Sequence, residues 1–475
     1  MFDTRVIPLD SLRNLHVTVM GLGLFGGGEG VTRFFCAHGA QVTVTDKRTP
    51  DVLAPSIERL AGLPVRWVLG EHREQDFTCA DLVVPSPAIP RDTPLLELAR
   101  DSGVALDTEM NLFWKYCPAK ICAITGTNGK TTTTSLIGHL ARAAWPATPV
   151  GGNLGRSLLP EVSCIHEDGW VVLELSSFQL EDLFALTRRP QVSVITNVTP
   201  NHLDRHHSYE NYLAAKRTIL EPSSDPNTAV LNAEDARVRS WHSHQRRTLY
   251  FGRSGLVRPR ASGVWVDIER GNVLLQHASE EHVLFSFDDL SLPGTFNLLN
   301  AAAAAAAVIA MGVPIDGIAP AIRAFRTVEH RLEPFHEMGG VRFFNDSIAT
   351  TPESTIAALD ALGPRVVLIC GGARGGDRSY TALGQRIARQ THSVVLVGQT
   401  ANDIAASIPT RGTRPRVHRA ATLEDAVRHA LDTAVPGDRV VLSPACASYD
   451  MFVNYMERGS RFKELIRDGA PHNNS

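Results

Sequence analysis

Short apolar runs that end in glycine-rich turns recur three times along this chain. The runs cover residues 16–20, 120–124 and 366–370. Strand-like and helix-like segments alternate through most of the sequence, a pattern that predicts parallel sheets with helical connections. We therefore expect an α/β protein of three domains. They are a Rossmann-like domain over 1–108, a central P-loop ATPase-type domain with a mostly parallel sheet over 109–326, and a second Rossmann-like domain over 327–475.

Two segments depart from this alternation. Residues 253–291 alternate polar and apolar positions, which predicts strands outside the main central sheet. Residues 301–311 are alanine-rich and apolar but too short to span a bilayer, so they predict a buried helix.

Composition narrows the class of protein. A length of 475 residues suits about three domains, and the net charge of −3 provides no broad basic field for nucleic acid or an anionic membrane. The seven cysteines are scattered and form no CxxC pair, and the first residues are too polar for a signal peptide. We expect a cytoplasmic protein with no nucleic-acid or membrane partner.

The most specific local motif is the segment Thr125-Gly-Thr-Asn-Gly-Lys-Thr131. A buried strand precedes it and a helix is predicted from about Thr131, so backbone N–H groups and a helix N-terminus converge on one point. Lys130 would reach the β- and γ-phosphates and Thr131 would bind Mg²⁺. The strict GxxxxGK[ST] pattern is not met, because Ile124 replaces its first glycine, and a plain strand–turn–helix remains the alternative. The predicted ATP-binding residues here are Gly126, Thr127, Asn128, Gly129, Lys130, Thr131 and Thr132.

A second glycine motif lies near the N-terminus. Gly21, Gly23 and Gly26 follow the first strand, and Asp46 ends the next one. By itself this is a dinucleotide fingerprint, which would favour NAD, but a lone GxGxxG is weak evidence.

The form TGTNGKTTT resembles the phosphate loop of the Mur ligases and of their folylpolyglutamate synthetase relatives. The resemblance extends over nearly the whole chain, and the strings ELSSFQLE and LSPACAS favour the glutamate-adding branch of the Mur ligases. The other matching segments are residues 197–205, 214–216, 292–294, 330–331 and 345–347, together with Asn297 and Asn300.

The resemblance implies a metal centre. Glu174, at the end of a predicted strand, would hold Mg²⁺ together with Thr131, and His202 would help to hold a second Mg²⁺. Lys216 matches a lysine that the family carbamylates, which makes it an oxygen ligand. From the residues alone, Glu174 could also be a surface acid, although this alternative is the weaker one. His202 would more often be a structural histidine and Lys216 a solvated lysine. Asn201 departs from the acid that usually precedes the histidine. The catalytic residues implied are Lys130, His202 and Lys216.

The resemblance also implies the nucleotide sites. The UDP group of the substrate would contact the turn at Gly23, Leu24 and Phe25 and the segment Asp46, Lys47 and Arg48, and Asn153 would touch the acceptor alanine. Adenine would be recognised by Asn297 and Asn300, with Phe296 in place of a usual histidine, and Arg331 and Asp346 would lie near the phosphates and ribose. Because this site is divided between two predicted domains, we expect domain closure to assemble it.

The pocket for the incoming amino acid departs from the family pattern. Ile348 replaces the lysine of the string NDSKAT, and residues 371–377 lack the lysine that usually follows GGDG. An aliphatic side chain cannot pair with a carboxylate, so the cation must come from elsewhere, with Arg374 as the candidate. Moving the cation favours L-glutamate over D-glutamate as the substrate. The predicted pocket residues are Thr350, Arg374, Ser448 and Tyr455, the last in place of a usual phenylalanine.

The resemblance therefore implies a ligase, expected to be monomeric, that uses ATP and Mg²⁺ to join glutamate, with L-glutamate favoured, to UDP-N-acetylmuramoyl-L-alanine in peptidoglycan synthesis. The alternatives are the same reaction with D-glutamate, a folylpolyglutamate synthetase-like ligase, an inactive nucleotide-binding regulator, and a dehydrogenase that binds NAD at residues 21–26.

Overall fold

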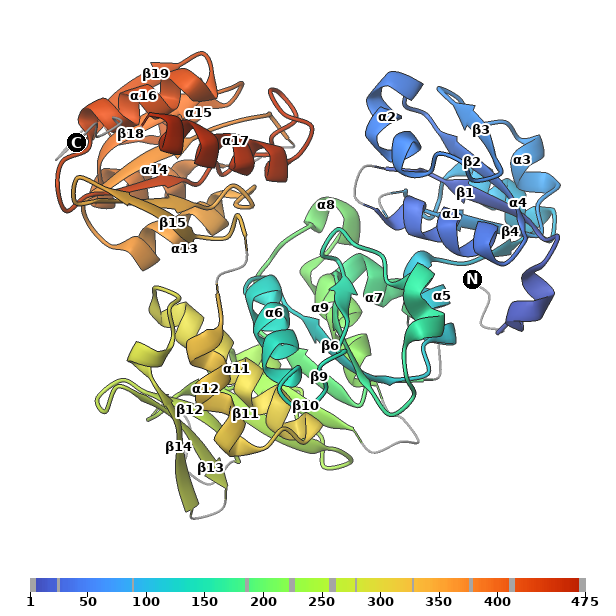
Figure 1. Ribbon diagram of the computed structural model, residues 1–475, viewed down its shortest axis with the longest axis horizontal. Helices are drawn as coiled ribbons and strands as arrows, with labels where there is room; N and C mark the ends of the chain where they lie inside the picture. Colours follow the sequence, from blue (N-terminus) through green and yellow to red (C-terminus); the bar gives the residue numbers. More distant parts are fainter. Residues whose placement is uncertain are drawn as a thin grey trace. The chain divides into compact units, whose positions relative to one another are not determined.

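The structure is a computed structural model. It describes residues 6–23, 26–87, 89–183, 188–221, 227–255, 262–277, 280–326, 329–375, 379–409 and 415–469. The predicted α/β fold is confirmed, because the strands form three sheets that are mostly parallel (Figure 1).

The first sheet has five parallel strands in the order β3-β2-β1-β4-β5. This is the strand order of a Rossmann-type sheet, in which ligands bind outside the carboxyl ends of the strands, at the point between β1 and β4 where the strand order reverses. Its strands are β1 His16–Met20, β2 Gln41–Asp46, β3 Val65–Leu69, β4 Leu82–Pro85 and β5 Ala105–Leu106. Its helices are α1 Gly27–Ala37, α2 Pro50–Arg59, α3 Gln75–Thr78 and α4 Pro94–Asp101.

The central sheet has nine strands in the order β14-β13-β12-β11-β10-β9-β6-β8-β7. Its strands are β6 Lys120–Thr125, β7 Val150–Gly152, β8 Trp170–Glu174, β9 Val192–Ile195, β10 Thr228–Asn232, β11 Arg247–Arg253, β12 Gly263–Asp267, β13 Asn272–His277 and β14 Glu280–Ser286. Its helices are α5 Glu109–Tyr116, α6 Lys130–Ala141, α7 Ser177–Leu183, α8 Leu203–His206, α9 Tyr209–Arg217, α10 Ala236–Arg239, α11 Thr295–Met311 and α12 Ile318–Ala324.

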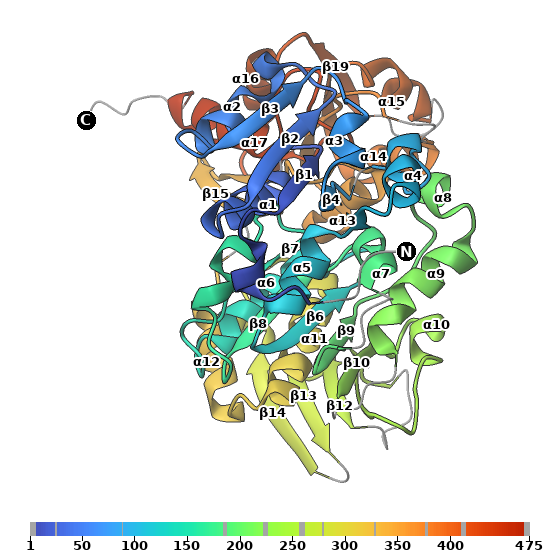
Figure 2. The same cartoon turned by 90° about the vertical axis from the view of Figure 1, so that its right-hand side faces the viewer.

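One prediction about this sheet is wrong. The strands of residues 253–291 were expected outside the central sheet, but β12 pairs in parallel with β11, and β13 and β14 follow as antiparallel strands (Figure 2). Alternating polar and apolar positions show only that each strand has one buried face. They do not show which edge the strand joins, and here the free edge of β11 accepts it.

The third sheet has six strands in the order β15-β16-β20-β17-β18-β19, with the edge strand β15 antiparallel to β16. Its strands are β15 Glu333–Met338, β16 Val341–Asn345, β17 Val366–Cys370, β18 Thr391–Val397, β19 Arg416–Ala420 and β20 Arg439–Leu442. Its helices are α13 Pro352–Leu362, α14 Thr381–Gln390, α15 Ala401–Ser407, α16 Leu423–Thr433 and α17 Tyr455–Asp468.

The chain divides into two compact units. Met1–Asp289 with Leu299–Arg323 form the first, and Leu290–Leu298 with Ala324–Ser475 form the second. The first unit therefore contains both the five-stranded and the nine-stranded sheet. The domain boundaries near residues 108 and 326 stay predictions.

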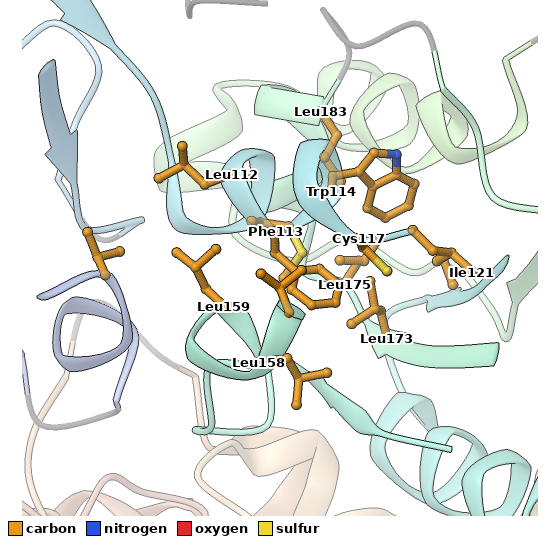
Figure 3. Close-up of a cluster of buried hydrophobic side chains, with 14 of the residues drawn as sticks. Leu112, Phe113, Trp114, Cys117, Ile121, Leu158, Leu159, Leu173, Leu175 and Leu183 are labelled. Carbon is orange, nitrogen blue, oxygen red and sulfur yellow. The ribbon is translucent and has the colours of Figure 1, made fainter. Parts of the chain in front are cut away.

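One hydrophobic core connects the first two sheets. Phe113 and Trp114 of α5 lie in one buried cluster with Leu159 and Leu173 (Figure 3). The same cluster includes residues of β1 and α1. Burying a large apolar side chain contributes about 1.5–3 kcal/mol, so α5 holds the two sheets of this unit together. None of the helices in the described ranges is long and apolar enough to cross a membrane.

The half-buried acid Glu109, the first residue of α5, lies beside this core. Burial raises the pKa of Glu109 to about 7, although the Ser157 hydroxyl donates a hydrogen bond to its carboxylate. The folded state therefore holds a proton that the unfolded state loses near pH 4.5. Its stabilising contribution is complete below pH 4.5 and is lost as the pH rises through 7, by up to about 3 kcal/mol.

Glu109→Gln mimics the protonated acid, so its stability advantage over the wild type should grow between pH 5 and pH 8. Urea unfolding of both proteins at the two pH values measures this, and all other titrating groups cancel in the comparison. An advantage that does not change with pH would show that Glu109 ionises normally.

Candidate functional site

The predicted phosphate loop connects β6 to α6, as expected. Gly129 has φ 79° and precedes Lys130, the first residue of α6. A Cβ on Gly129 would lie 2.4 Å from Oδ1 of Asn300, so both backbone angle and space require glycine. No side chain caps this helix, so the N–H groups of its first turn are suited to an anion.

The loop is held in shape by the end of β9. The side chain of Asn197 accepts from the backbone N–H of Asn128 (2.9 Å) and donates to the Asn128 carbonyl (2.9 Å). The Thr196 hydroxyl donates to the same carbonyl (2.6 Å), and the Thr127 N–H donates to the Asn197 carbonyl. The loop is therefore preorganised by its neighbour strand.

Two lysines lie at this loop. Lys130 Nζ donates to the Thr127 carbonyl (2.8 Å), and Lys216 Nζ donates to the Gly126 carbonyl (2.8 Å). Lys216 is 2% exposed, so it is not a solvated lysine. Burial and the nearby charge of Lys130 hold the pKa of Lys216 well below its usual value, while Glu174 opposes the shift. A lysine in this setting favours the neutral amine.

Glu174 ends β8 beside β6 and is buried. One carboxylate oxygen accepts from the side chain of Asn153 (3.0 Å). The other, Oε2, is buried and has no hydrogen-bond partner among the described residues. A buried carboxylate oxygen without a donor is costly unless a cation balances it, so Glu174 fits a Mg²⁺ ligand.

The described residues contain no group of three or more His, Cys, Asp and Glu side chains that could hold a metal. Mg²⁺ binds proteins through one or two carboxylates, with water and phosphate oxygens completing its shell. Of the predicted ligands, Glu174 lies near enough to Lys216 for its charge to oppose the lowering of the Lys216 pKa. Thr131 lies on the first turn of α6 and is buried.

His202 lies on the turn before α8 and is exposed, with a left-handed φ of 53°. Asn201, where the family has an acid, accepts from the His202 backbone N–H (2.9 Å). The ring of Phe178 lies edge-on to His202, with centroids 5.1 Å apart, and stacks on His206 at 5.3 Å. The turn that carries His202 is thus supported by the helix that follows Glu174.

The predicted UDP residues come together in part. The Gly23 N–H donates to Asp46 (3.3 Å), and Arg48 forms an ion pair with Asp46 (3.0 Å). Lys47 is exposed beside them. Leu24 and Phe25 lie outside the described residues. The Asn153 side chain donates to Glu174, so the loop predicted to touch the acceptor alanine lies beside the carboxylate predicted to bind Mg²⁺.

The two asparagines predicted to recognise adenine lie at the start of α11 and are buried. Asn300 accepts from the Thr133 hydroxyl (3.4 Å) and lies against Gly129, so it is directly at the phosphate loop. The Asn297 amide donates to the Pro293 carbonyl (2.7 Å).

In the second unit, Asp346 follows β16. Burial raises its pKa to about 6, while the Ser443 hydroxyl (2.6 Å) and the Leu332 N–H (3.0 Å) donate to it. Arg331 has a buried Nε with no partner among the described residues. His330 and Leu332 have φ of 63° and 42°, so the turn that carries Arg331 is strained. An unsatisfied donor on a strained turn fits a residue that awaits an anionic ligand.

The residues predicted to bind the amino acid surround the carboxyl ends of β16, β17 and β20. Ser448 is buried, whereas Thr350 and Tyr455 are partly exposed. The guanidinium of Arg374 forms an ion pair with Asp403 (2.8 Å), and its side chain is 63% exposed.

Sequence reasoning missed several residues of this site. Tyr212 is one: its hydroxyl is hydrogen-bonded to Thr127 Oγ1 (2.8 Å) and its ring lies 4.7 Å from Lys216 Nζ. The signal was available, because Tyr212 and Lys216 are four residues apart on one helix. Asn197 stood within a quoted motif without being assigned a role. The residues around Arg458 in the sequence gave no indication that it belongs to a functional site.

Family models match along the chain. The description "Mur ligase MurD-like, N-terminal domain" matches residues 15–107, "Mur ligase middle domain" matches 124–308, and "Mur ligase, glutamate ligase domain" matches 330–446. The chain belongs to the Mur ligase family. It is an ATP-dependent, amide-bond-forming ligase of peptidoglycan synthesis, as the resemblance implied.

Curated relatives agree over almost the full length. The chain is 42% identical over 475 residues to a protein of Roseiflexus sp. named UDP-N-acetylmuramoylalanine–D-glutamate ligase, which covers 96% of this chain and 99% of the relative. A protein of the same name from Symbiobacterium thermophilum is 37% identical, covering 95% and 97%.

Solved structures show the same fold. The UDP-N-acetylmuramate-alanine ligase MurC of Thermotoga maritima matches with a TM-score of 0.64 and 20% identity, covering 96% of this chain and 100% of that one. The MurF ligase of the same organism, in complex with ADP, matches with a TM-score of 0.57 and 18% identity, covering 98% and 99%.

Proposed function

We propose that this ligase joins glutamate to the alanine carboxylate of UDP-N-acetylmuramoyl-L-alanine through an acyl phosphate, with L-glutamate preferred. The observation that supports the chemistry best is the grouping of Lys130, Lys216 and Glu174 around one uncapped helix N-terminus. Relatives named for glutamate addition to UDP-N-acetylmuramoylalanine support the acceptor.

In the first step, an oxygen of the alanine carboxylate attacks the γ-phosphorus of ATP, and ADP leaves with the electrons of the broken P–O bond. The N–H groups of the first turn of α6 and the Lys130 ammonium stabilise the charge on the transferring group. We expect Asn153 to hold the alanine end of the acceptor here, and its hydrogen bond to Glu174 supports this role.

In the second step, the neutral amine of glutamate attacks the acyl carbon, phosphate leaves and the nitrogen loses a proton to solvent. Glu174 and Thr131 would hold one Mg²⁺, and His202 with a carbamylated Lys216 would hold a second; when bound, these ions would neutralise charge on the phosphates. The buried oxygen of Glu174 that has no hydrogen-bond partner within the described part of the chain supports Mg²⁺ binding here. Asn297, Asn300, Arg331 and Asp346 are the proposed contacts to the rest of ATP.

The preference for L-glutamate is supported by the cations of the pocket. Ile348 is half-buried where the family has a lysine, and Arg374 pairs with Asp403 at the surface. An exposed ion pair contributes about 0–1 kcal/mol, so Arg374 can exchange Asp403 for a substrate carboxylate at little cost. A cation at Arg374, in place of one at position 348, changes which enantiomer of glutamate can bind both carboxylates while its amine points at the acyl carbon.

D-glutamate is the second candidate, because both relatives above are named for it. Phosphate release and product mass, measured with each enantiomer, separate the two. We expect kcat/KM for L-glutamate to exceed that for D-glutamate at least about tenfold, the difference that a single well-placed polar contact produces.

Reactions without acceptor and without glutamate are the controls, because a ligase releases phosphate only when both are present. A preference for D-glutamate would refute the enantiomer proposal and leave the ligase assignment intact. No release with either enantiomer would refute the proposed reaction itself.

A further inference from the structure

Arg458 is a buried arginine on the first turn of α17. It is 2% exposed, and its guanidinium donates four hydrogen bonds to backbone carbonyls and a fifth to a hydroxyl. Burial lowers its pKa to about 10, so it remains a cation at neutral pH. A buried guanidinium whose N–H groups are all hydrogen-bonded holds the groups that accept those bonds in a fixed geometry.

The first partner of Arg458 is the turn that follows β16. Nε donates to the Ser347 hydroxyl (3.0 Å) and Nη2 to the Ser347 carbonyl (2.8 Å). The Ser347 hydroxyl in turn donates to the carbonyl of Tyr455 (2.7 Å). These bonds fix the segment between Asp346 and Thr350 against the start of α17.

The second partner is the loop that follows β20. Nη1 donates to the carbonyls of Cys446 (3.2 Å) and Ala447 (3.3 Å), and Nη2 also donates to Cys446 (3.2 Å). Ala445 in this loop has a left-handed φ of 60°, which costs free energy for a residue with a Cβ. The arginine therefore holds a strained loop whose next residue is Ser448.

The third partner is the loop that follows β17. The Ala373 N–H donates to the Ala447 carbonyl (2.9 Å), which Arg458 also binds. A Cβ on Gly372 would lie 3.2 Å from Nη1 of Arg458 and 2.4 Å from the Ala447 carbonyl, so this backbone packs directly on the guanidinium. Arg374 continues from this loop.

We propose that Arg458 is the positioning residue of the amino-acid site, because its one guanidinium fixes the relative position of the three strand-end loops that carry Thr350, Arg374 and Ser448. The inference rests on the proposed function for the identity of the site. Arg458 has no N–H left for a ligand, so it acts through these loops and does not bind glutamate itself.

Arg458→Lys keeps the charge but cannot span four acceptors with one ammonium group. A displacement of reacting groups of about 1 Å costs on the order of 100-fold, so we expect kcat/KM for glutamate to fall by about that factor, mainly through KM. The KM for UDP-N-acetylmuramoyl-L-alanine should stay within about twofold, because its predicted residues lie in the other compact unit. Arg461→Ala is the control, since this exposed arginine on the same helix pairs with Glu424.

The wild type, Arg458→Lys, Arg461→Ala and Ser347→Ala are assayed together by phosphate release, with thermal unfolding recorded for each. Ser347→Ala removes one hydrogen-bond acceptor of Arg458. If Arg458→Lys does not fold, Ser347→Ala tests the inference by the same comparison of the KM for glutamate with the KM for UDP-N-acetylmuramoyl-L-alanine. Equal changes in the KM of all three substrates, or an unchanged KM for glutamate, would overturn the inference. An inactive wild type would instead refute the proposed reaction.

Discussion

Lys130→Ala is expected to lower kcat at least about 100-fold, the loss that follows removal of one preorganised group at a developing charge. Lys130 begins α6, and its ammonium already lies over the loop, bonded to the Thr127 carbonyl. When a triphosphate enters, the ammonium can exchange this carbonyl for the phosphate whose charge increases as it transfers. No other cation in the loop can replace it, because residues 125–129 carry no charge.

The matched control is Lys120→Ala. Lys120 lies at the opposite end of the same strand, β6, and is exposed. Phosphate release in the presence of acceptor and glutamate measures both variants, and their thermal unfolding should resemble that of the wild type. Full turnover by Lys130→Ala would contradict the assignment of this loop as the site of phosphoryl transfer.

Lys216→Met is expected to cause a comparable loss, again on the order of 100-fold or more in kcat. The lowered pKa of Lys216 makes the neutral amine available, and this amine can add to the carbon of CO₂ and release a proton. The product is a carbamate anion beside the phosphate loop, where the ammonium of an ordinary lysine would repel a metal. Methionine has a similar length but cannot form the carbamate.

Mass spectrometry of the native wild type should detect one CO₂ adduct, and peptide mapping should place it on Lys216 and not on the exposed Lys120. Because the amine must be neutral to react, activity should fall as the pH drops through the lowered pKa and should rise with added bicarbonate. An active Lys216→Met enzyme, or a wild type whose activity does not depend on bicarbonate after CO₂ is removed, would refute this role.

The sequence by itself determined the local parts of the protein. The α/β order, the strand at 366–370 and the turn before α6 were predictable, because apolar periodicity and glycine conformations act over a few residues. The family resemblance supplied the ligase class, since its motifs occur in order along the chain. The position of Glu174 at a strand end was predictable from the apolar run Val171-Val172-Leu173 that precedes it, and Glu174 is the last residue of β8.

Only the tertiary structure decided contacts between distant segments. It showed that β12 to β14 extend the central sheet, that Asn153 contacts Glu174, and that Arg458 connects three loops of the second unit. These pairings depend on which sheet edge is free and on which groups need partners once water is excluded. A pattern of neighbouring residues contains neither kind of information, because both arise only when segments far apart in the sequence are packed together.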